Sequence, residues 1–296
     1  MNWPRALRYR LEAGAARVVL QAASVMPLGG VVALARTAGW LVFHLWRQRR
    51  EIALDNLRRA GIAPDLAAAR AITLEAFRTF CLMVAESVVA LRRLTPKNWQ
   101  EFVTMRWTNE VRELIERPGQ GLIVGSAHIG NWEVAARAAS MVRPVVYVHR
   151  PLSNPHLQAL TFSGRSGANL RLVSSLDRDP FRFLDMLARG EILALMVDQH
   201  AGDQRIQVDF FGRPAWTTKS VAMLHLLTRV PLIMAFALRT APLRYEVHFA
   251  GPFRFARTGD RERDAFDITQ ALTREVETVI RRYPTQYMWG HRRWKP

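Results

Sequence analysis

Short apolar runs that alternate with helical segments are the feature that most constrains the fold of this chain. The apolar runs cover residues 121–125, 144–148, 192–197, 232–237 and 245–249. Apolar residues at helical spacing lie near residues 66–91, 131–141, 180–189, 217–229 and 262–282. Continuous apolar strands between helices are typical of an α/β fold with a buried sheet. We therefore expect a mostly buried mixed sheet flanked by helices.

The first 50 residues differ from the rest of the chain. Eighteen residues without a formal charge separate Arg17 from Arg36, and a second uncharged run covers residues 37–46. A bilayer span takes roughly 17–25 apolar residues, so the first run is borderline, and residues 27–30 (Pro-Leu-Gly-Gly) interrupt it. We expect a helical, membrane-associated region at 1–50 and an α/β domain at 51–296.

The sequence leaves the mode of membrane association open. The region fits a single membrane anchor, or a pair of helices on the membrane surface with tryptophans at the headgroup level. It also fits a secretory signal, with Ala33-Leu34-Ala35 as an A-x-A cleavage site. The plainest interpretation is a buried pair of helices, and membrane association is the favoured one.

The composition points to an anionic partner. Of the 296 residues, 42 are Lys or Arg and 25 are Asp or Glu, a net charge of +17, and only three of the bases are lysines. Arginine binds phosphate or carboxylate bidentately, so nucleic acid, anionic lipid, a phosphorylated substrate and an acidic carrier protein are candidates. The single cysteine excludes an intramolecular disulfide, and the histidines lack metal-ligand spacing. We expect no metal and no cofactor.

The segment from Ile123 to Glu133 is the strongest candidate for chemistry. An apolar strand ends in small residues, His128 follows at the turn, and Glu133 comes five residues later where a helix begins. Ligands bind beyond the carboxyl ends of strands in open α/β sheets. A carboxylate that accepts a proton from one ring nitrogen leaves the other nitrogen free to deprotonate a hydroxyl. His128 and Glu133 are therefore predicted as a catalytic pair.

The His128-x4-Glu133 spacing resembles the H-x4-D/E signature of glycerolipid and lysophospholipid acyltransferases. The full motif, His-Ile-Gly-Asn-Trp-Glu, resembles that of the late acyltransferases of lipid A biosynthesis. Four further segments resemble blocks of the same branch, in the same order: Tyr147–Pro155, Val197–Gln199, Phe210–Thr218 and Tyr283–Lys295. The ordered set covers the chain from about residue 120 to its end. The resemblance implies a glycerolipid acyltransferase-like fold.

The resemblance also implies site residues. His128 would be the general base and Glu133 its orienting partner, without a covalent acyl-enzyme. Arg165 and Asp198 match family positions, Asp198 as the acidic residue at the end of a later strand, and both are predicted to bind substrate. An arginine there suits a phosphate or a developing oxyanion. Arg150, after a strand end, is a further candidate for phosphate binding. Asn131 is a candidate substrate contact, with helix capping as the alternative.

The activity implied is transfer of a fatty acyl group from a thioester, usually on acyl carrier protein and sometimes on coenzyme A, to a hydroxyl of a phosphorylated glycolipid such as a lipid A precursor. The expected location is the cytoplasmic face of the inner membrane. One alternative is acylation of a mannosylated phosphoinositide or lysophospholipid from acyl-coenzyme A. The alternative from another class, a basic nucleic-acid-binding protein, explains the charge but not His128, Glu133 or the apolar N-terminus, so no nucleic-acid partner is expected.

Overall fold

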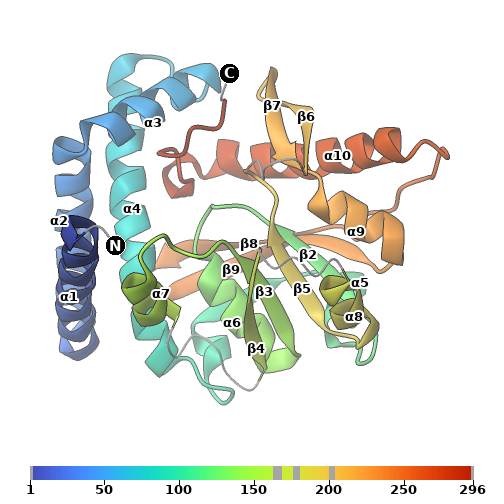
Figure 1. The fold of residues 1–296 in the computed structure, drawn as a ribbon, viewed down its shortest axis with the longest axis horizontal. Coiled ribbons are helices and arrows are strands. Elements are labelled where there is room, and N and C mark those ends of the chain that lie inside the picture. Colours follow the sequence, from blue (N-terminus) through green and yellow to red (C-terminus); the bar gives the residue numbers. More distant parts are fainter. Residues whose placement is uncertain (1–2, 163–168, 176–180, 200–203, 295–296) are drawn as a thin grey trace.

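A seven-stranded sheet forms the centre of the protein in the computed structural model, which describes residues 3–162, 169–175, 181–199 and 204–294 (Figure 1). The strand order is β1-β9-β8-β2-β5-β3-β4. Neighbouring strands run parallel except for the antiparallel pair β8 and β9. The expected mixed α/β sheet is confirmed.

The strands of this sheet are β1 (Val103–Arg106), β2 (Leu122–Ser126), β3 (Val145–His149), β4 (Leu170–Ser174), β5 (Ile192–Met196), β8 (Leu232–Ala241) and β9 (Arg244–Ala250). Five of them coincide with the apolar runs in the sequence. The sequence analysis did not identify β1 and β4. Both are edge strands, where a continuous apolar run is not needed because one side of the strand has no neighbour.

The helices are α1 (Trp3–Val25), α2 (Leu28–Leu45), α3 (Arg47–Arg59), α4 (Leu66–Arg93), α5 (Asn109–Glu116), α6 (Trp132–Val142), α7 (Pro155–Phe162), α8 (Arg182–Ala188), α9 (Ser220–Thr228) and α10 (Arg261–Arg282). Short 3-10 turns lie at Trp99–Glu101 and Pro284–Gln286. The five helices expected from apolar spacing are present. Polar caps begin three of them, since the side chains of Asp65, Asn131 and Asp260 accept backbone N–H groups of α4, α6 and α10.

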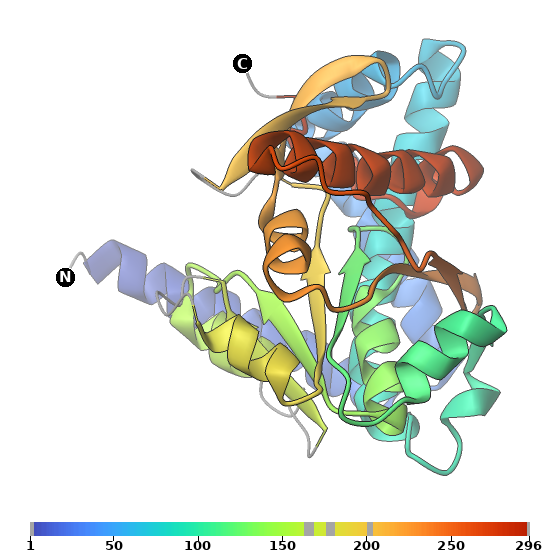
Figure 2. The ribbon, with the colours of Figure 1, turned by 90° about the vertical axis from the view of Figure 1, so that its right-hand side faces the viewer.

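Helices cover both faces of the sheet (Figures 1 and 2). Successive side chains of β2 point to opposite faces of the sheet. Ile123 packs with residues of α9 and α10 on one face, whereas Leu122 and Val124 pack with residues of α5 and α6 on the other. All three side chains avoid water this way. The sheet is therefore buried on both faces, and its strand ends are left as the exposed edges where side chains can meet a ligand.

The N-terminal region is two helices and not one long span. The first uncharged run is divided at Pro27, where α1 has ended and α2 begins. Within the described residues, α2 is the one helix long and apolar enough to cross a membrane, by length and composition only. Its buried side packs closely along α4, since a Cβ added at Gly39 would lie 2.4 Å from the Cα of Arg78.

The opposite side of α2 exposes large apolar side chains, namely Leu34, Trp40, Leu41 and Leu45. A contiguous exposed apolar face suits a membrane surface or a partner. The division expected between residues 50 and 51 falls inside α3, Arg47–Arg59.

A two-stranded hairpin, β6 (Arg205–Phe210) with β7 (Arg213–Thr218), projects beside α10 (Figure 1). Its turn is formed by Phe211 and Gly212, which both have positive φ, 55° and 72°. Such turns match the twist of paired strands. The Phe-Phe-Gly-Arg-Pro motif noted in the sequence is therefore a hairpin turn.

Candidate active site

The carboxyl ends of β2 and β5 place two titratable side chains opposite each other. These strands are parallel neighbours, with Ser126 paired to Met196. His128 and Asp198 each lie two residues further along, so the same register carries them to one edge of the sheet. The backbone N–H of Val197 donates to the carbonyl of Ser126 at 2.8 Å, which extends the pairing towards the turn.

His128 and Asp198 are joined by two hydrogen bonds. Oδ1 of Asp198 lies 2.8 Å from Nδ1 of His128, and Oδ2 accepts the backbone N–H of the same histidine at 3.1 Å. Because an ionised carboxylate only accepts, Nδ1 carries a proton and Nε2 has the free lone pair. The side-chain amide of Gln199 also lies 3.2 Å from Nδ1. The imidazole is 20 % exposed, so a substrate can reach it, while the Asp198 side chain is 1 % exposed.

The surroundings of Asp198 favour its ionised form. Burial pushes the pKa of Asp198 upward, but the charge and hydrogen bonds of His128 and the positive charge of Arg293 bring the pKa below its ordinary value. The hydroxyl of Tyr287 is a further hydrogen-bond partner of the carboxylate, and burial together with the Asp198 charge raises the Tyr287 pKa well above its usual value. The phenol therefore stays neutral and can donate.

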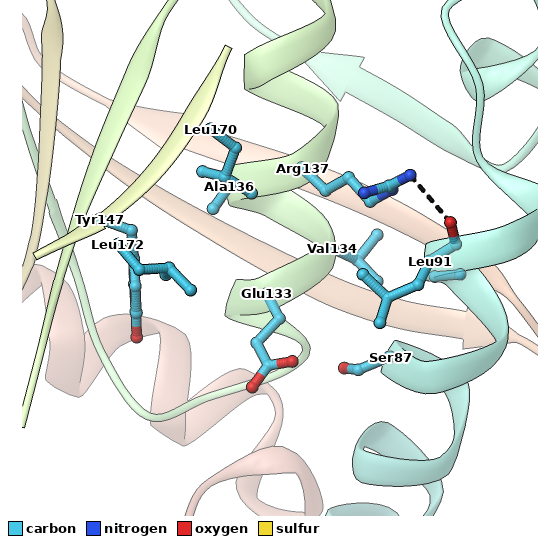
Figure 3. Close-up of a pocket in the computed structure, with 10 residues that line it drawn as sticks. Ser87, Leu91, Glu133, Val134, Ala136, Arg137, Tyr147, Leu170 and Leu172 are labelled. Atoms are coloured by element: carbon cyan, nitrogen blue, oxygen red, sulfur yellow. Dashed lines mark hydrogen bonds between the residues drawn. The ribbon is translucent and has the colours of Figure 1, made fainter. Parts of the chain in front are cut away.

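Glu133, the orienting carboxylate expected from the sequence, is not the group at Nδ1, where Asp198 stands. Glu133 lies in the first turn of α6, and it lines an apolar crevice together with Ser87 of α4 and Tyr147 of β3 (Figure 3). Its position at the start of α6 places Glu133 at that crevice. Asp198 instead follows β5, which ends directly beside β2. The hydrogen bonds at Nδ1 therefore assign the orienting contact to Asp198.

Asn131 is a helix cap in the structure. It is 2 % exposed, and its Oδ1 accepts the backbone N–H of Val134 at 3.2 Å and the hydroxyl of Ser87 at 3.0 Å. Its Nδ2 donates to the carbonyl of Met83 at 3.1 Å and to the hydroxyl of Tyr245 at 3.2 Å. These contacts use the amide within the protein and correct the expectation that Asn131 contacts substrate.

Gly130 fixes the turn between His128 and α6. Its φ is +60°, and a Cβ at this position would lie 1.9 Å from the carbonyl oxygen of Ala237. Only glycine allows this close approach to β8 without strain. The backbone N–H of Asn131 donates to the same carbonyl at 2.7 Å, so the turn is fastened to the middle of the sheet.

The two arginines expected at the site have different outcomes. Arg150 is exposed and directly follows β3, whose carboxyl end lies at the same edge as His128 but two strands away, a separation of about 10 Å. Arg165 lies outside the described residues.

Two apolar crevices adjoin α6 close to His128. The larger lies between α6 and the sheet, and Ser126, Trp132 and Met196 form the part of its wall nearest the histidine. The ring of Trp132 lies edge-on to the imidazole at 5.0 Å. The smaller is drawn in Figure 3, and the two share Ala136 and Tyr147. An elongated apolar group would bury its surface here.

Part of the arginine excess has a structural use. The guanidinium of Arg143 is buried and donates to backbone carbonyls, among them Leu114 at 3.0 Å and Gly190 at 3.2 Å. Arg137 donates to the carbonyls of Leu91 and Leu94 at the end of α4, at 2.9 and 3.1 Å. These contacts satisfy carbonyls that a helix or loop end would otherwise leave unpaired. The net charge therefore overstates the positive charge available to a partner.

Within the residues that the structure describes, no three His, Cys, Asp or Glu side chains are grouped so as to hold a metal ion.

The sequence analysis did not assign Tyr287 and Arg293 to the site. Both lie in the C-terminal block Tyr283–Lys295, which mixes aromatic and basic residues. The signal was the motif itself. The proximity of Tyr287 and Arg293 to Asp198 depends on the course of the chain after α10, which no local pattern reveals.

Comparison with known proteins places the chain among bacterial enzymes. The family model described as bacterial lipid A biosynthesis acyltransferase matches residues 5–296. A lipid A biosynthesis acyltransferase of Haemophilus influenzae is 26 % identical over 270 residues, which are 87 % of this chain and 81 % of that protein.

Two relatives from Escherichia coli carry more specific names. The lipid A biosynthesis lauroyltransferase is 28 % identical over 207 residues, 67 % of this chain and 65 % of that enzyme. The lipid A biosynthesis palmitoleoyltransferase is 22 % identical over 257 residues, 84 % of this chain and 79 % of that enzyme. The two names differ in the acyl chain transferred.

Proposed function

The chain belongs to the family of bacterial lipid A biosynthesis acyltransferases and is an acyltransferase, and from this premise we propose that it transfers a fatty acyl group from a thioester to a hydroxyl of a lipid A precursor. The family resemblance inferred from the sequence motifs is confirmed. The observation that carries the proposed mechanism is the pair His128–Asp198, at 2.8 Å, beside an apolar crevice.

His128 acts as general base through Nε2. As the lipid hydroxyl attacks the thioester carbonyl carbon, Nε2 takes the hydroxyl proton and a tetrahedral intermediate forms. The intermediate collapses, the carbon–sulfur bond breaks, and the imidazolium returns the proton to the departing thiolate. The products are an ester and a free thiol, so atoms and charges balance. Asp198 holds the Nδ1–H and stabilises the transient imidazolium.

The apolar crevice between α6 and the sheet accommodates the acyl chain. Its wall is apolar and contains the small side chains of Ala135, Ala139 and Ala194. The crevice begins next to Ser126 and Met196, each two residues before a member of the pair, so a chain lying in it has its thioester end near Nε2. This geometry supports a positioned donor, which contributes to rate by proximity.

Glu133 is the second carboxylate of the proposed site. It lies on the first turn of α6, and it lines the smaller crevice. Arg150 and Arg165 are proposed to bind phosphate of the acceptor, because guanidinium groups bind phosphate oxygens in pairs. The acyl donor is proposed to be acyl carrier protein, with coenzyme A thioester as the alternative.

The proposed location is the cytoplasmic face of the inner membrane. The exposed apolar side of α2 supports membrane contact, and the exposed Trp40, on α2, and Trp46, directly after it, suit the headgroup level. A lipid acceptor reaches the site from the bilayer, and a carrier-bound donor reaches it from the aqueous phase.

The test is an acyl-transfer assay with the full-length protein in detergent micelles. A phosphorylated lipid A precursor is offered with lauroyl-acyl carrier protein or with lauroyl-coenzyme A, and the ester product is identified by mass spectrometry. We expect transfer from the carrier-bound donor and none by His128→Ala. Acylation of a lysophospholipid but not of the lipid A precursor would overturn the proposed acceptor, and faster transfer from coenzyme A would overturn the proposed donor.

A further inference from the structure

The C-terminal segment, residues 283–294, lies directly against the turn that carries His128. The backbone N–H of Gly130 donates to the carbonyl of Gln286, and that of Met288 donates to the carbonyl of His128, both at 3.0 Å. Between these bonds, Ile129 and Tyr287 form an isolated antiparallel bridge. The segment therefore holds the turn on both sides of the histidine.

Side chains of the same segment reach behind the turn to Asp198. Tyr287 is 5 % exposed, and its hydroxyl is a hydrogen-bond partner of the carboxylate. Arg293 is 4 % exposed and donates to the carbonyl of Trp216 at 2.7 Å and to the hydroxyl of Thr217 at 2.5 Å. These bonds hold its positive charge close enough to act on Asp198.

The segment is also fastened from the N-terminal side. Asn56 of α3 is buried and donates to the carbonyls of Trp289 and His291, at 2.7 and 2.6 Å. Arg49 of the same helix donates to the carbonyl of Gly290 at 2.9 Å. Helix α3 therefore holds the backbone that connects Tyr287 to Arg293, so both side chains are kept in place.

We propose that Tyr287 and Arg293 are positioning residues for catalysis, which hold the carboxylate of Asp198 against the turn of His128 so that it is directed at Nδ1 of the imidazole. This inference rests on the proposed function, in which His128 is the base. The titratable and charged groups that act on the pair are Tyr287 and Arg293, both from the C-terminal segment, and the neutral amide of Gln199 lies 3.2 Å from Nδ1.

The physical reason is the cost of a buried carboxylate. Asp198 has 1 % of its side chain exposed, and burial alone favours the neutral acid. A protonated Asp198 could donate to Nδ1, which would move the ring proton to Nε2 and remove the base. A hydroxyl donor and a fixed cation stabilise the carboxylate instead. The two residues thus decide the tautomer of a histidine that neither of them needs to touch.

The experiment compares Tyr287→Phe, Arg293→Met and Arg293→Lys with Tyr283→Phe as the matched control. Tyr283 lies in the same segment, and its ring packs near His248 instead of Asp198. Two readouts are taken on the full-length protein in detergent micelles. The first is kcat and KM for lauroyl transfer to the lipid A precursor across pH. The second is the tautomer of His128 from ¹⁵N-histidine NMR, assigned with His128→Ala, which needs no substrate.

We expect Tyr287→Phe and Arg293→Met to lower kcat about tenfold or more, with little change in KM. Both changes make Asp198 easier to protonate, so the acidic limb of the pH profile moves to higher pH, and the Nε2–H tautomer of His128 gains population. Arg293→Lys, which keeps the charge, is expected to restore the tautomer. Tyr283→Phe is expected to match the unaltered protein in both readouts.

An unchanged tautomer and an unchanged pH profile in Tyr287→Phe would overturn the inference, whatever the loss of rate, because a purely structural role predicts loss without either shift. Failure of the proposed function looks different. In that case the unaltered protein transfers no acyl group, or His128→Ala remains active, while the tautomer still responds to Tyr287→Phe.

Discussion

His128 and Asp198 are 70 residues apart in the sequence, yet Nδ1 of the histidine lies 2.8 Å from Oδ1 of the aspartate. The second carboxylate oxygen accepts the backbone N–H of the same histidine at 3.1 Å. One carboxylate thus fixes both the main chain and the ring of a single residue. The orientation of the candidate base is therefore a property of two adjacent parallel strands.

Replacement of His128 by alanine is expected to abolish acyl transfer and to leave the fold intact. The imidazole is partly exposed at a turn, so its loss creates no core cavity, but the buried Asp198 carboxylate loses its partner, and the free energy of unfolding should fall by about 1–3 kcal/mol. Product formation is measured by mass spectrometry, and folding by the thermal midpoint. Transfer near the rate of the unaltered enzyme would show that another group is the base.

The roles of the two carboxylates, Asp198 and Glu133, are distinguished by comparing the variants Asp198→Asn and Glu133→Gln. Both changes are expected to lower kcat, and Asp198→Asn by about 100- to 10,000-fold, because an amide has one acceptor oxygen for the backbone N–H and the Nδ1–H that the carboxylate now accepts, so its NH2 group faces Nδ1 when the oxygen accepts the backbone N–H. Only Asp198→Asn is expected to change the His128 tautomer in ¹⁵N NMR. The same tautomer change in Glu133→Gln would mean that Glu133, and not Asp198, orients the ring.

Gly130→Ala is expected to impair both activity and stability. A Cβ would lie 1.9 Å from the carbonyl of Ala237 at a φ of +60°, so the turn must shift and His128 with it. The strain should cost about 1–3 kcal/mol in stability. Gly61→Ala is the matched control, since Gly61 has a φ of +61° with open space around it. The control should lose stability but keep kcat, and equal losses of kcat in both would argue against a displaced turn.

The stability of the folded state should fall in acid partly through Asp198. The pKa of Asp198 is lower in the folded protein than its ordinary value, so its ionisation stabilises the fold above about pH 4, the usual range for an unfolded aspartate. That contribution is lost as the pH falls through the folded pKa. Thermal midpoints measured between about pH 6 and pH 3 should therefore fall less steeply in Asp198→Asn. Parallel curves for the two proteins would contradict this.

Arg150→Ala is expected to raise KM for the phosphorylated acceptor several-fold and to leave kcat nearly unchanged, because the charge contacts the lipid in ground state and transition state alike. Arg117→Ala is the control, since Arg117 is equally exposed but precedes β2 at the opposite end of the strand. Equal effects of the two variants would indicate a general loss of positive charge and not a phosphate contact.

Local patterns in the sequence determined most of the framework. Apolar runs and helical spacing placed β2, β5 and α6, and the position of His128 after a strand followed from the order of the residues. Strand and helix formation depend on side-chain periodicity and on turn residues within a few positions, so one segment of sequence is enough to predict them. The family was identified by the same kind of evidence, motifs in a fixed order.

Tertiary structure alone decided which side chains meet. Asp198 reaches His128 because β5 lies beside β2 in a parallel register, although β3 and β4 lie between them in the chain. Tyr287 joins them because the chain returns after α10 and pairs with Ile129. Asn131 became a buried cap for the same reason, because α4 and β9 close over its amide. Contacts between distant segments are fixed by strand order, register and packing, and these are properties of the folded chain as a whole.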